Sequence, residues 1–232
     1  MVADRADTLR TVAADVSDPP EDRTALVDLL GVLAYAELCA FDRLAEDARM
    51  APTLAGRTAM CAMATVEFGH HRRLARRLED LGVPPAAAME PFVAALETYH
   101  ALTEPATWLE GVVKAYVGDG MAADFYREIA EFVDPSTRAL IHEVIADSGR
   151  AEFAVHEVQA ALAAQPAAAG RLALWARRLV GEAISQTQHV LADRDALMRL
   201  FLAGTGMAGV SALIERITDR HAERMRALGL TR

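Results

Sequence analysis

The feature that most constrains the fold is a helical spacing of apolar residues that runs through nearly the whole chain. In residues 22–49 apolar side chains recur every three or four positions, and the same spacing continues in residues 53–81. Pro52 lies between these segments and cannot continue a helix, so it marks a tight turn between two long helices. No segment shows the strict alternation of apolar and polar residues that a half-buried strand requires. The sequence therefore predicts an all-α protein.

Glycine and proline divide the rest of the chain into further helices. Gly82 and the two prolines that follow it end the second helix, and a short helix is expected over residues 86–102. The apolar spacing then predicts four more helices, over residues 105–133, 135–164, 168–202 and 207–227.

Two helical hairpins follow from this order, and they are joined by a connection long enough to run the length of a bundle. This is the ferritin-like four-helix arrangement with one long crossover. We expect a single domain over residues 1–232, with the four-helix core at about 22–164 and two accessory helices at about 168–227.

Composition and charge narrow the function classes. The net charge is −9, and an acidic chain is not drawn to nucleic acid by its overall charge. Arg72, Arg73, Arg76 and Arg77 are a local exception, which we interpret as a solvated helix face. No apolar run approaches the roughly 20 uncharged residues of a membrane span, and the N-terminal residues lack a signal-peptide pattern. We expect a cytoplasmic protein without a membrane partner.

A metal site is predicted on the first two helices. Glu37 lies on an otherwise apolar helix face, where a carboxylate is costly to bury unless it is paired or binds a metal. Glu67 and His70 are three residues apart and share a helix face. Glu37 precedes Pro52 by 15 residues and Glu67 follows it by 15. At 1.5 Å per residue both lie about 22 Å from the turn, which puts them at the same level of the bundle.

The second hairpin repeats this pattern in an altered form. Asp119 lies 16 residues before Pro135 and Asp147 lies 12 residues after it, which agrees to within about one helical turn. The separations within the two hairpins are also similar, at 30 and 28 residues. In a dimetal carboxylate bundle a second Glu-x-x-His is expected here, but the sequence has Asp147 and Arg150 at these two positions.

Four segments carry a resemblance to a known family: AYAELCAFDRLA, TVEFGHHRRL, AYVGDGMAADFY and IADSGRAEFA. They resemble the MiaE-like branch of the ferritin-like superfamily, typified by a non-haem diiron tRNA hydroxylase that acts on methylthio-isopentenyl-adenosine. The resemblance covers about residues 22–164. It implies a dioxygen-dependent hydroxylase or oxidase with iron, a tRNA or small-molecule substrate, an electron-donor protein, and room for a homodimer. It implies ligand positions at Glu37, Glu67, His70, Asp119 and Asp147.

Arg150 departs from the family pattern and leaves two functions open. An arginine side chain is permanently protonated and only donates hydrogen bonds, so it cannot bind a metal. Arg150 either pairs with Asp147 or Asp119, which leaves one metal ion or none, or points away while water or another side chain completes a second ion. The chain is then an iron-dependent hydroxylase or oxidase, or a non-catalytic bundle that kept the fold as a scaffold or binding protein.

Glycines and tyrosines close to the predicted metal ligands indicate what surrounds the site. Glycine inside a helix costs about 1 kcal/mol relative to alanine, so several glycines at one level indicate a cavity, a close helix approach or small-residue packing. Tyr35 and Tyr116 are the tyrosines expected to line a site, if they are not simply core residues. The glycines concerned are Gly69, Gly118, Gly120 and Gly149.

Overall fold

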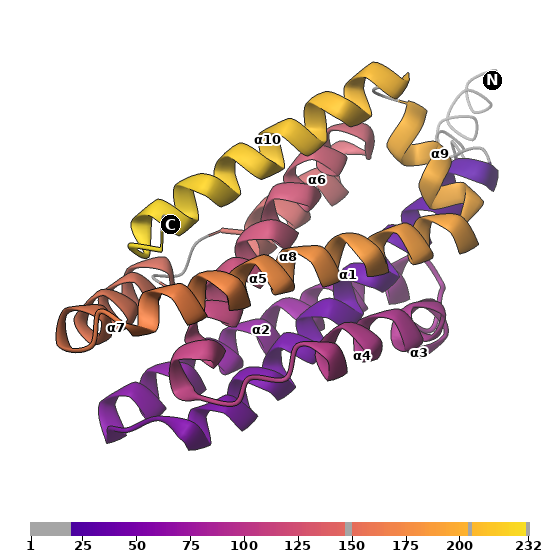
Figure 1. The fold of residues 1–232 in the computed structure, drawn as a ribbon. Helices are drawn as coiled ribbons and strands as arrows, with labels where there is room; N and C mark the ends of the chain where they lie inside the picture. Colours follow the sequence, from indigo (N-terminus) through magenta and orange to yellow (C-terminus); the bar gives the residue numbers. More distant parts are fainter. Residues whose placement is uncertain (1–19, 147–149, 204–205, 231–232) are drawn as a thin grey trace, which may run out of the picture.

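The computed structural model describes residues 20–146, 150–203 and 206–230, and all regular elements in these ranges are helical (Figure 1). Helix α1 (Pro20–Asp47) and helix α2 (Leu54–Asp80) form the first hairpin, joined by a 3-10 turn at Ala48–Met50. The hydroxyl of Thr53 caps α2 by accepting a hydrogen bond of 3.0 Å from the Gly56 amide. After α2 the chain turns at Gly82, whose φ of 71° is readily adopted by glycine.

The crossover connects the two hairpins along the length of the bundle. It consists of α3 (Pro85–Met89), a 3-10 turn at Glu90–Phe92 and α4 (Val93–Leu102). Helix α3 lies against α1 so closely that a Cβ added at Gly31 would be 2.2 Å from the carbonyl oxygen of Ala88. The predicted all-α fold with one long crossover is confirmed.

The second hairpin starts with α5 (Trp108–Ile129), which a 3-10 turn at Ala130–Phe132 extends. Asp134 caps the next helix, because its Oδ1 accepts hydrogen bonds of 3.0 Å from two backbone amides, those of Ser136 and Thr137.

The fourth helix of the bundle is interrupted. The sequence predicted one helix over residues 135–164, whereas the structure has α6 (Pro135–Val144) and α7 (Arg150–Ala164). Ile145 leaves the helix with φ −87° and ψ 3°. The sequence after Ala146 is Asp-Ser-Gly, three residue types of low helix propensity.

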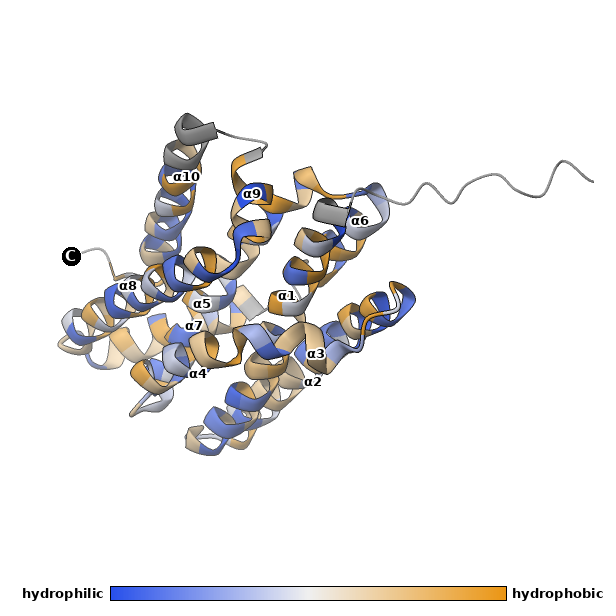
Figure 2. Ribbon diagram, turned by 90° about the vertical axis from the view of Figure 1, so that its right-hand side faces the viewer, coloured by the Kyte–Doolittle hydropathy of each residue, from blue (hydrophilic) through white to orange (hydrophobic). Residues whose placement is uncertain are grey.

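Three accessory helices cover the core: α8 (Ala168–Asp193), α9 (Asp195–Ala203) and α10 (Gly206–Ala227). Helix α8 packs on α4 and α5, α9 packs on α1, and α10 packs on α5 and α9 (Figure 1). Long helices such as α8 and α2 carry both hydrophobic and hydrophilic residues (Figure 2), as expected for helices around a shared core.

Arg194 separates α8 from α9, where the sequence predicted one continuous helix over residues 168–202. Its φ of −127° and ψ of 80° are not helical. The guanidinium donates hydrogen bonds to both carboxylate oxygens of Asp28 on α1 and lies 5.7 Å from the ring centroid of Phe92. These two tertiary contacts hold Arg194 in its non-helical conformation.

In the described part of the chain, two apolar clusters fill the interior, and the predicted metal ligands lie between them. On α1, Leu33 belongs to one cluster and Leu44 to the other, with Glu37 between. On α2, Ala64 and Leu74 flank Glu67 and His70 in the same way. The polar side chains therefore lie at the boundary of two packed regions.

One helix among the described residues, residues 23–50, is long and apolar enough to cross a membrane by length and composition alone. Half of its most apolar window is buried inside the protein, as expected for the core helix of a bundle.

Candidate metal centre

Three side chains from two helices converge at the predicted level. One ligand atom from each of Glu37, Glu67 and His70 lies within 4.8 Å of the others. The Nδ1 atom of His70 is 3.4 Å from Oε2 of Glu37 and 3.3 Å from Oε2 of Glu67. Glu67 is 2% exposed and His70 is 7% exposed. A metal ion binds such atoms at about 2.0–2.2 Å, so one ion fits among all three.

The hairpin geometry explains why these groups meet. Glu67 and His70 share a face because they are three residues apart on α2. Glu37 reaches their level because both helices run for the same length from the turn. His71 fixes the two helices relative to each other, since its Nδ1 lies 2.8 Å from the carbonyl oxygen of Ala34, one turn before Glu37 on α1.

Asp119 brings a third helix to the site. It lines a cavity of about 50 Å³ together with Glu37 and Glu67. The end of α6 forms another wall, and small side chains leave the space open: Ala36, Ala40, Ala122 and Ala123. The structure thus places three predicted carboxylates around one cavity.

Burial raises the pKa of Asp119 to about 7, and the nearby His70 charge opposes this shift. Carboxylates that face one cavity without a cation repel each other and tend to bind protons. A metal ion would remove this penalty. Two carboxylates and one imidazole are a donor set that suits iron, manganese or zinc, and the buried donor set therefore fits a metal.

The other half of the predicted site is not described. Asp147 lies outside the described residues, and Arg150 begins α7 but its side chain is also outside the described part. The ligand role of Asp147 and the effect of Arg150 stay predictions. Glu143, which shares the helix face expected for Asp147, is exposed and lies 3.2 Å from Arg73.

Tyr126 is a site residue that the sequence reasoning missed. It lines the same cavity as the three carboxylates. It follows Asp119 by seven residues, two helical turns, and this spacing was the available signal. Burial first, and then the negative charge of Glu37, raises the pKa of Tyr126, so its hydroxyl remains a hydrogen-bond donor. Of the two tyrosines expected at the site, Tyr116 lines a neighbouring pocket and Tyr35 donates to Glu97 at 2.9 Å.

Comparison with known proteins supports the fold. The chain matches the family described as the ferritin-like domain of actinomycetes over residues 20–204. A solved structure, "Protein 19 with aldehyde deformylating oxidase activity from Synechococcus", is similar with a TM-score of 0.70 and 18% identity. The similarity covers 92% of this chain and 93% of that chain. No curated protein matches the chain. The MiaE-like branch stays a prediction, and the match over residues 20–204 shows that the chain belongs to the actinomycete ferritin-like domain family.

Proposed function

We propose that the protein binds iron at Glu37, Glu67 and His70 and uses dioxygen there to oxidise a small organic substrate. The observation that carries this proposal is the convergence of two carboxylates and one imidazole, with ligand atoms within 4.8 Å of one another. Similarity of fold to a protein with aldehyde deformylating oxidase activity supports an oxidase or hydroxylase by analogy only.

Each side chain has a distinct task in this proposal. Iron, when bound, supplies the electrons that dioxygen accepts. Glu37 and Glu67 balance the positive charge, and Nδ1 of His70 provides a neutral nitrogen ligand. Asp119 can hold or release a proton close to neutral pH, because its pKa is raised to about 7. Tyr126 presents a hydroxyl donor to the same cavity, and the surrounding alanines leave room beside the metal position.

The proposal includes a substrate class and partner proteins. A cavity of about 50 Å³ favours a small molecule over a tRNA base. The electron-donor protein, the homodimer and the cytoplasmic location are part of the same proposal. The second candidate function is a non-catalytic ferritin-like bundle, which the arginine at position 150 favours because it cannot bind a metal.

The deciding experiment is iron loading without oxygen, followed by elemental analysis and by spectra during reoxidation. The unmodified protein is expected to retain iron, and Glu67→Gln and His70→Ala are expected to lose it. His142→Ala is the matched control, because His142 is exposed on α6. An unmodified protein without iron, or equal iron in all four proteins, would refute the proposal in favour of the non-catalytic bundle.

The number of ions is tested at Arg150. Exchange of Arg150 for His restores the ligand type expected in a dimetal bundle. If position 150 faces the site, the iron content per chain of Arg150→His rises above that of the unmodified protein. An unchanged iron content means that position 150 does not face the site.

A further inference from the structure

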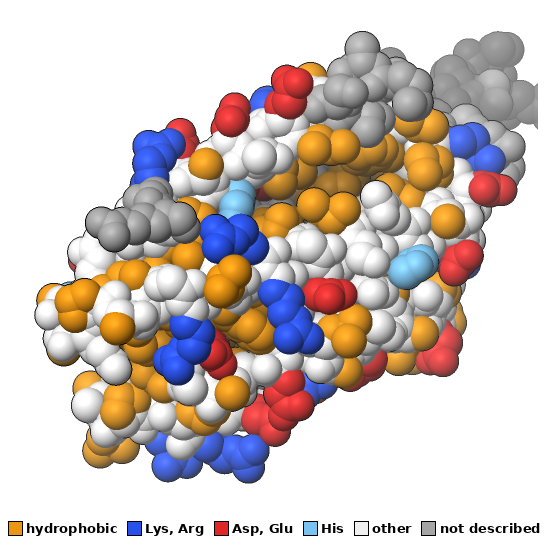
Figure 3. Space-filling model, in the orientation of Figure 1, with side chains coloured by type: hydrophobic (Ala, Val, Ile, Leu, Met, Phe, Trp, Pro, Cys, Tyr) orange, Lys and Arg blue, Asp and Glu red, His pale blue; other side chains and the backbone are white. Residues whose placement is uncertain are grey.

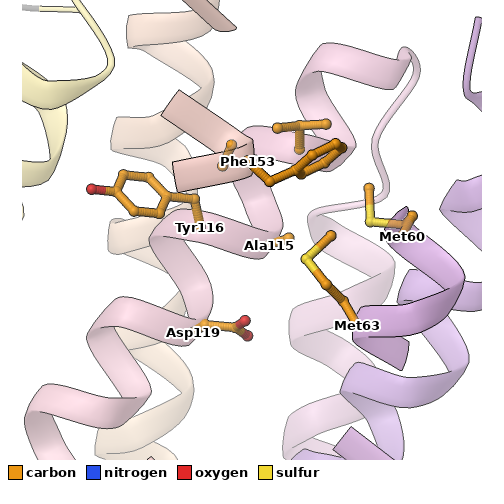
Figure 4. Close-up of a pocket in the computed structure, with 8 residues that line it drawn as sticks. Met60, Met63, Ala115, Tyr116, Asp119 and Phe153 are labelled. Carbon is orange, nitrogen blue, oxygen red and sulfur yellow. The ribbon is translucent and has the colours of Figure 1, made fainter. Parts of the chain in front are cut away.

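A second pocket adjoins the candidate metal centre and differs from it in chemistry. It lies between α2, α5 and α7 and has a volume of about 10 Å³. Met60 and Met63 line it from α2, Ala115 and Asp119 from α5, and Phe153 from α7 (Figure 4). Figure 4 shows the ring of Tyr116 turned away from the two methionines. The carboxylate of Asp119 is therefore the polar group of an otherwise apolar pocket.

This chemistry disfavours water as an occupant. A buried water molecule needs about two to four polar partners, whereas cavities lined by apolar side chains stay dry and bind apolar ligands such as xenon. Asp119 alone cannot satisfy a water molecule. The volume of about 10 Å³ also leaves no room for an organic substrate.

Asp119 links this pocket to the metal centre. The same carboxyl group lines the larger cavity that Glu37 and Glu67 share. Asp119 therefore forms a wall that the apolar pocket shares with the cavity of the candidate metal centre. Met60 is fully buried and Met63 is partly exposed. Because methionine is unbranched and flexible, Met63 can move to admit a small molecule.

We propose that this pocket holds dioxygen beside the metal centre. Dioxygen is apolar and needs no hydrogen-bond partners, which matches the lining. The volume of about 10 Å³ is close to the smallest space that holds one water molecule, so dioxygen enters only when Met63 moves. The inference rests on the proposed function, because the dioxygen would react at the metal. The side chains that define the pocket also give the means to test it without a metal.

Xenon is the probe for the pocket itself. Crystals of the metal-free protein under xenon pressure are expected to contain a xenon atom in contact with Met63 and Phe153. Ala115→Val adds two methyl groups inside the pocket and should abolish this xenon site. Met63→Ala enlarges the pocket and should raise the xenon occupancy. Ala183→Val, a change of the same size on α8 at a position that lines neither cavity, should leave the xenon site unchanged.

Absence of xenon from this pocket in both the unmodified protein and Met63→Ala would overturn the proposal. The Met63→Ala measurement remains decisive even if Ala115→Val does not fold.

The reaction with dioxygen tests the identity of the ligand. In stopped-flow mixing of iron(II)-loaded protein with dissolved dioxygen, Ala115→Val is expected to react severalfold more slowly at unchanged iron content. Ala183→Val should react like the unmodified protein. An unchanged rate in a variant without the xenon site would overturn the assignment to dioxygen.

The two proposals fail in different ways. A protein that binds iron but no xenon refutes the pocket alone. A protein that binds xenon but no iron refutes the proposed function and, with it, the assignment to dioxygen.

Discussion

At the scale of single residues, Lys114 is the one lysine of the chain and is buried between α5 and the crossover. Its Nζ donates a 2.7 Å hydrogen bond to the carbonyl oxygen of Thr103. Burial lowers the pKa of Lys114 to about 8, and the negative charge of Asp47 opposes this shift. Burial also raises the pKa of Asp47 to about 6. The pair therefore carries opposite charges at neutral pH, although burial disfavours both.

We expect a directly measured pKa of about 8 for Lys114. Reductive methylation with a ¹³C label and NMR titration give this value. The Lys114 signal is the one that Lys114→Arg lacks, which separates it from the terminal amino group with its similar pKa. Asp47→Asn should lower the pKa further, since it removes the main charge that stabilises the ammonium group. Glu131→Gln, at an exposed position, is the control and should leave the pKa unchanged. An ordinary pKa near 10.5 in the unmodified protein would contradict the burial of Lys114.

The sign of the pH dependence follows from the same pKa. The folded-state pKa of about 8 lies below the reference value of 10.5. Between these values the unfolded chain binds more protons at Lys114 than the folded protein does. The contribution of Lys114 to the free energy of unfolding therefore rises with pH across this window.

The candidate ligands on the first hairpin could be predicted from the sequence, because their positions along the bundle axis follow from the number of residues that separates each from the turn. Equal distances from Pro52 put Glu37 and Glu67 at one level, and the structure brings them together with His70. Tyr126 could not be separated from ordinary core aromatics, because burial and proximity to Glu37 are tertiary properties. The roles of these residues as ligands stay predictions until iron is measured.

At the scale of helices, glycines that look alike in sequence have different environments. A Cβ added at Gly69 would meet no atom within 4 Å, so no close packing explains this glycine. A Cβ at Gly120 would be 2.6 Å from Cδ of Arg224 on α10, and one at Gly118 would be 3.6 Å from the Tyr99 hydroxyl. Gly149 lies outside the described residues. Close packing thus applies to Gly120, and Gly118 has only ordinary contact.

A matched pair of alanine substitutions tests this distinction. Gly69→Ala should stabilise the protein by up to about 1 kcal/mol, because alanine favours the helix and the added methyl group meets nothing. Gly31→Ala should destabilise it, because a Cβ there would lie 2.2 Å from the backbone carbonyl of Ala88 and would force α3 away from α1. Urea unfolding measures both changes. Equal effects of the two substitutions would contradict the close approach of α3 to α1.

Two breaks within predicted helices, at Arg194 and after Val144, depend on different kinds of information. Residues 168–202 have a continuous helical pattern, yet the structure interrupts it at Arg194. The contacts with Asp28 and Phe92 come from distant parts of the chain, so local propensity cannot reveal them. The break after Val144 is easier to predict from the sequence, because Asp, Ser and Gly have low helix propensity. Apolar periodicity by itself predicts a single helix in both segments.

At the scale of the whole molecule, ion pairs attach the accessory helix α10 to the core. Asp124 on α5 is buried, and its carboxylate lies 2.7 Å from Nη1 of Arg224. Glu128, one turn further along α5, lies 2.7 Å from Nη2 of Arg216. On the face shown in Figure 3, hydrophobic side chains line a hollow between α10 and α8. Ion pairs with α5 therefore help to hold α10 in place beside this hollow.

Removal of the buried carboxylate should weaken the attachment of α10. Asp124→Asn removes the carboxylate that Arg224 and Arg127 contact, whereas Arg220 keeps Glu128 at 3.2 Å. Because these guanidinium groups are partly exposed, the cost is about 1–3 kcal/mol. Hydrogen exchange should show faster exchange of α10 amides than of α2 amides. Glu131→Gln, which removes an exposed partner 3.8 Å from Arg138, should have almost no effect. Uniformly faster exchange throughout the bundle would show that Asp124 stabilises the core rather than α10.

Metal binding should connect the site to the stability of the whole bundle. A ligand at 100 times its dissociation constant stabilises the folded state by about 2.7 kcal/mol, which for a chain of this size raises the melting temperature by about 5–10 °C. Cobalt(II) should therefore raise the melting temperature of the unmodified protein but not that of Glu67→Gln.

Without metal, Glu67→Gln should no longer be the less stable of the two proteins. Glu67→Gln removes one of the carboxylates that face Asp119 across the cavity, and repulsion between like charges then decreases. The metal-free variant should be at least as stable as the metal-free unmodified protein, because a site built to bind a cation is strained without one. Thermal unfolding of both proteins after treatment with a chelator measures this difference. A variant that is less stable without metal and gains as much from cobalt would show that Glu67 supports packing and does not bind the ion.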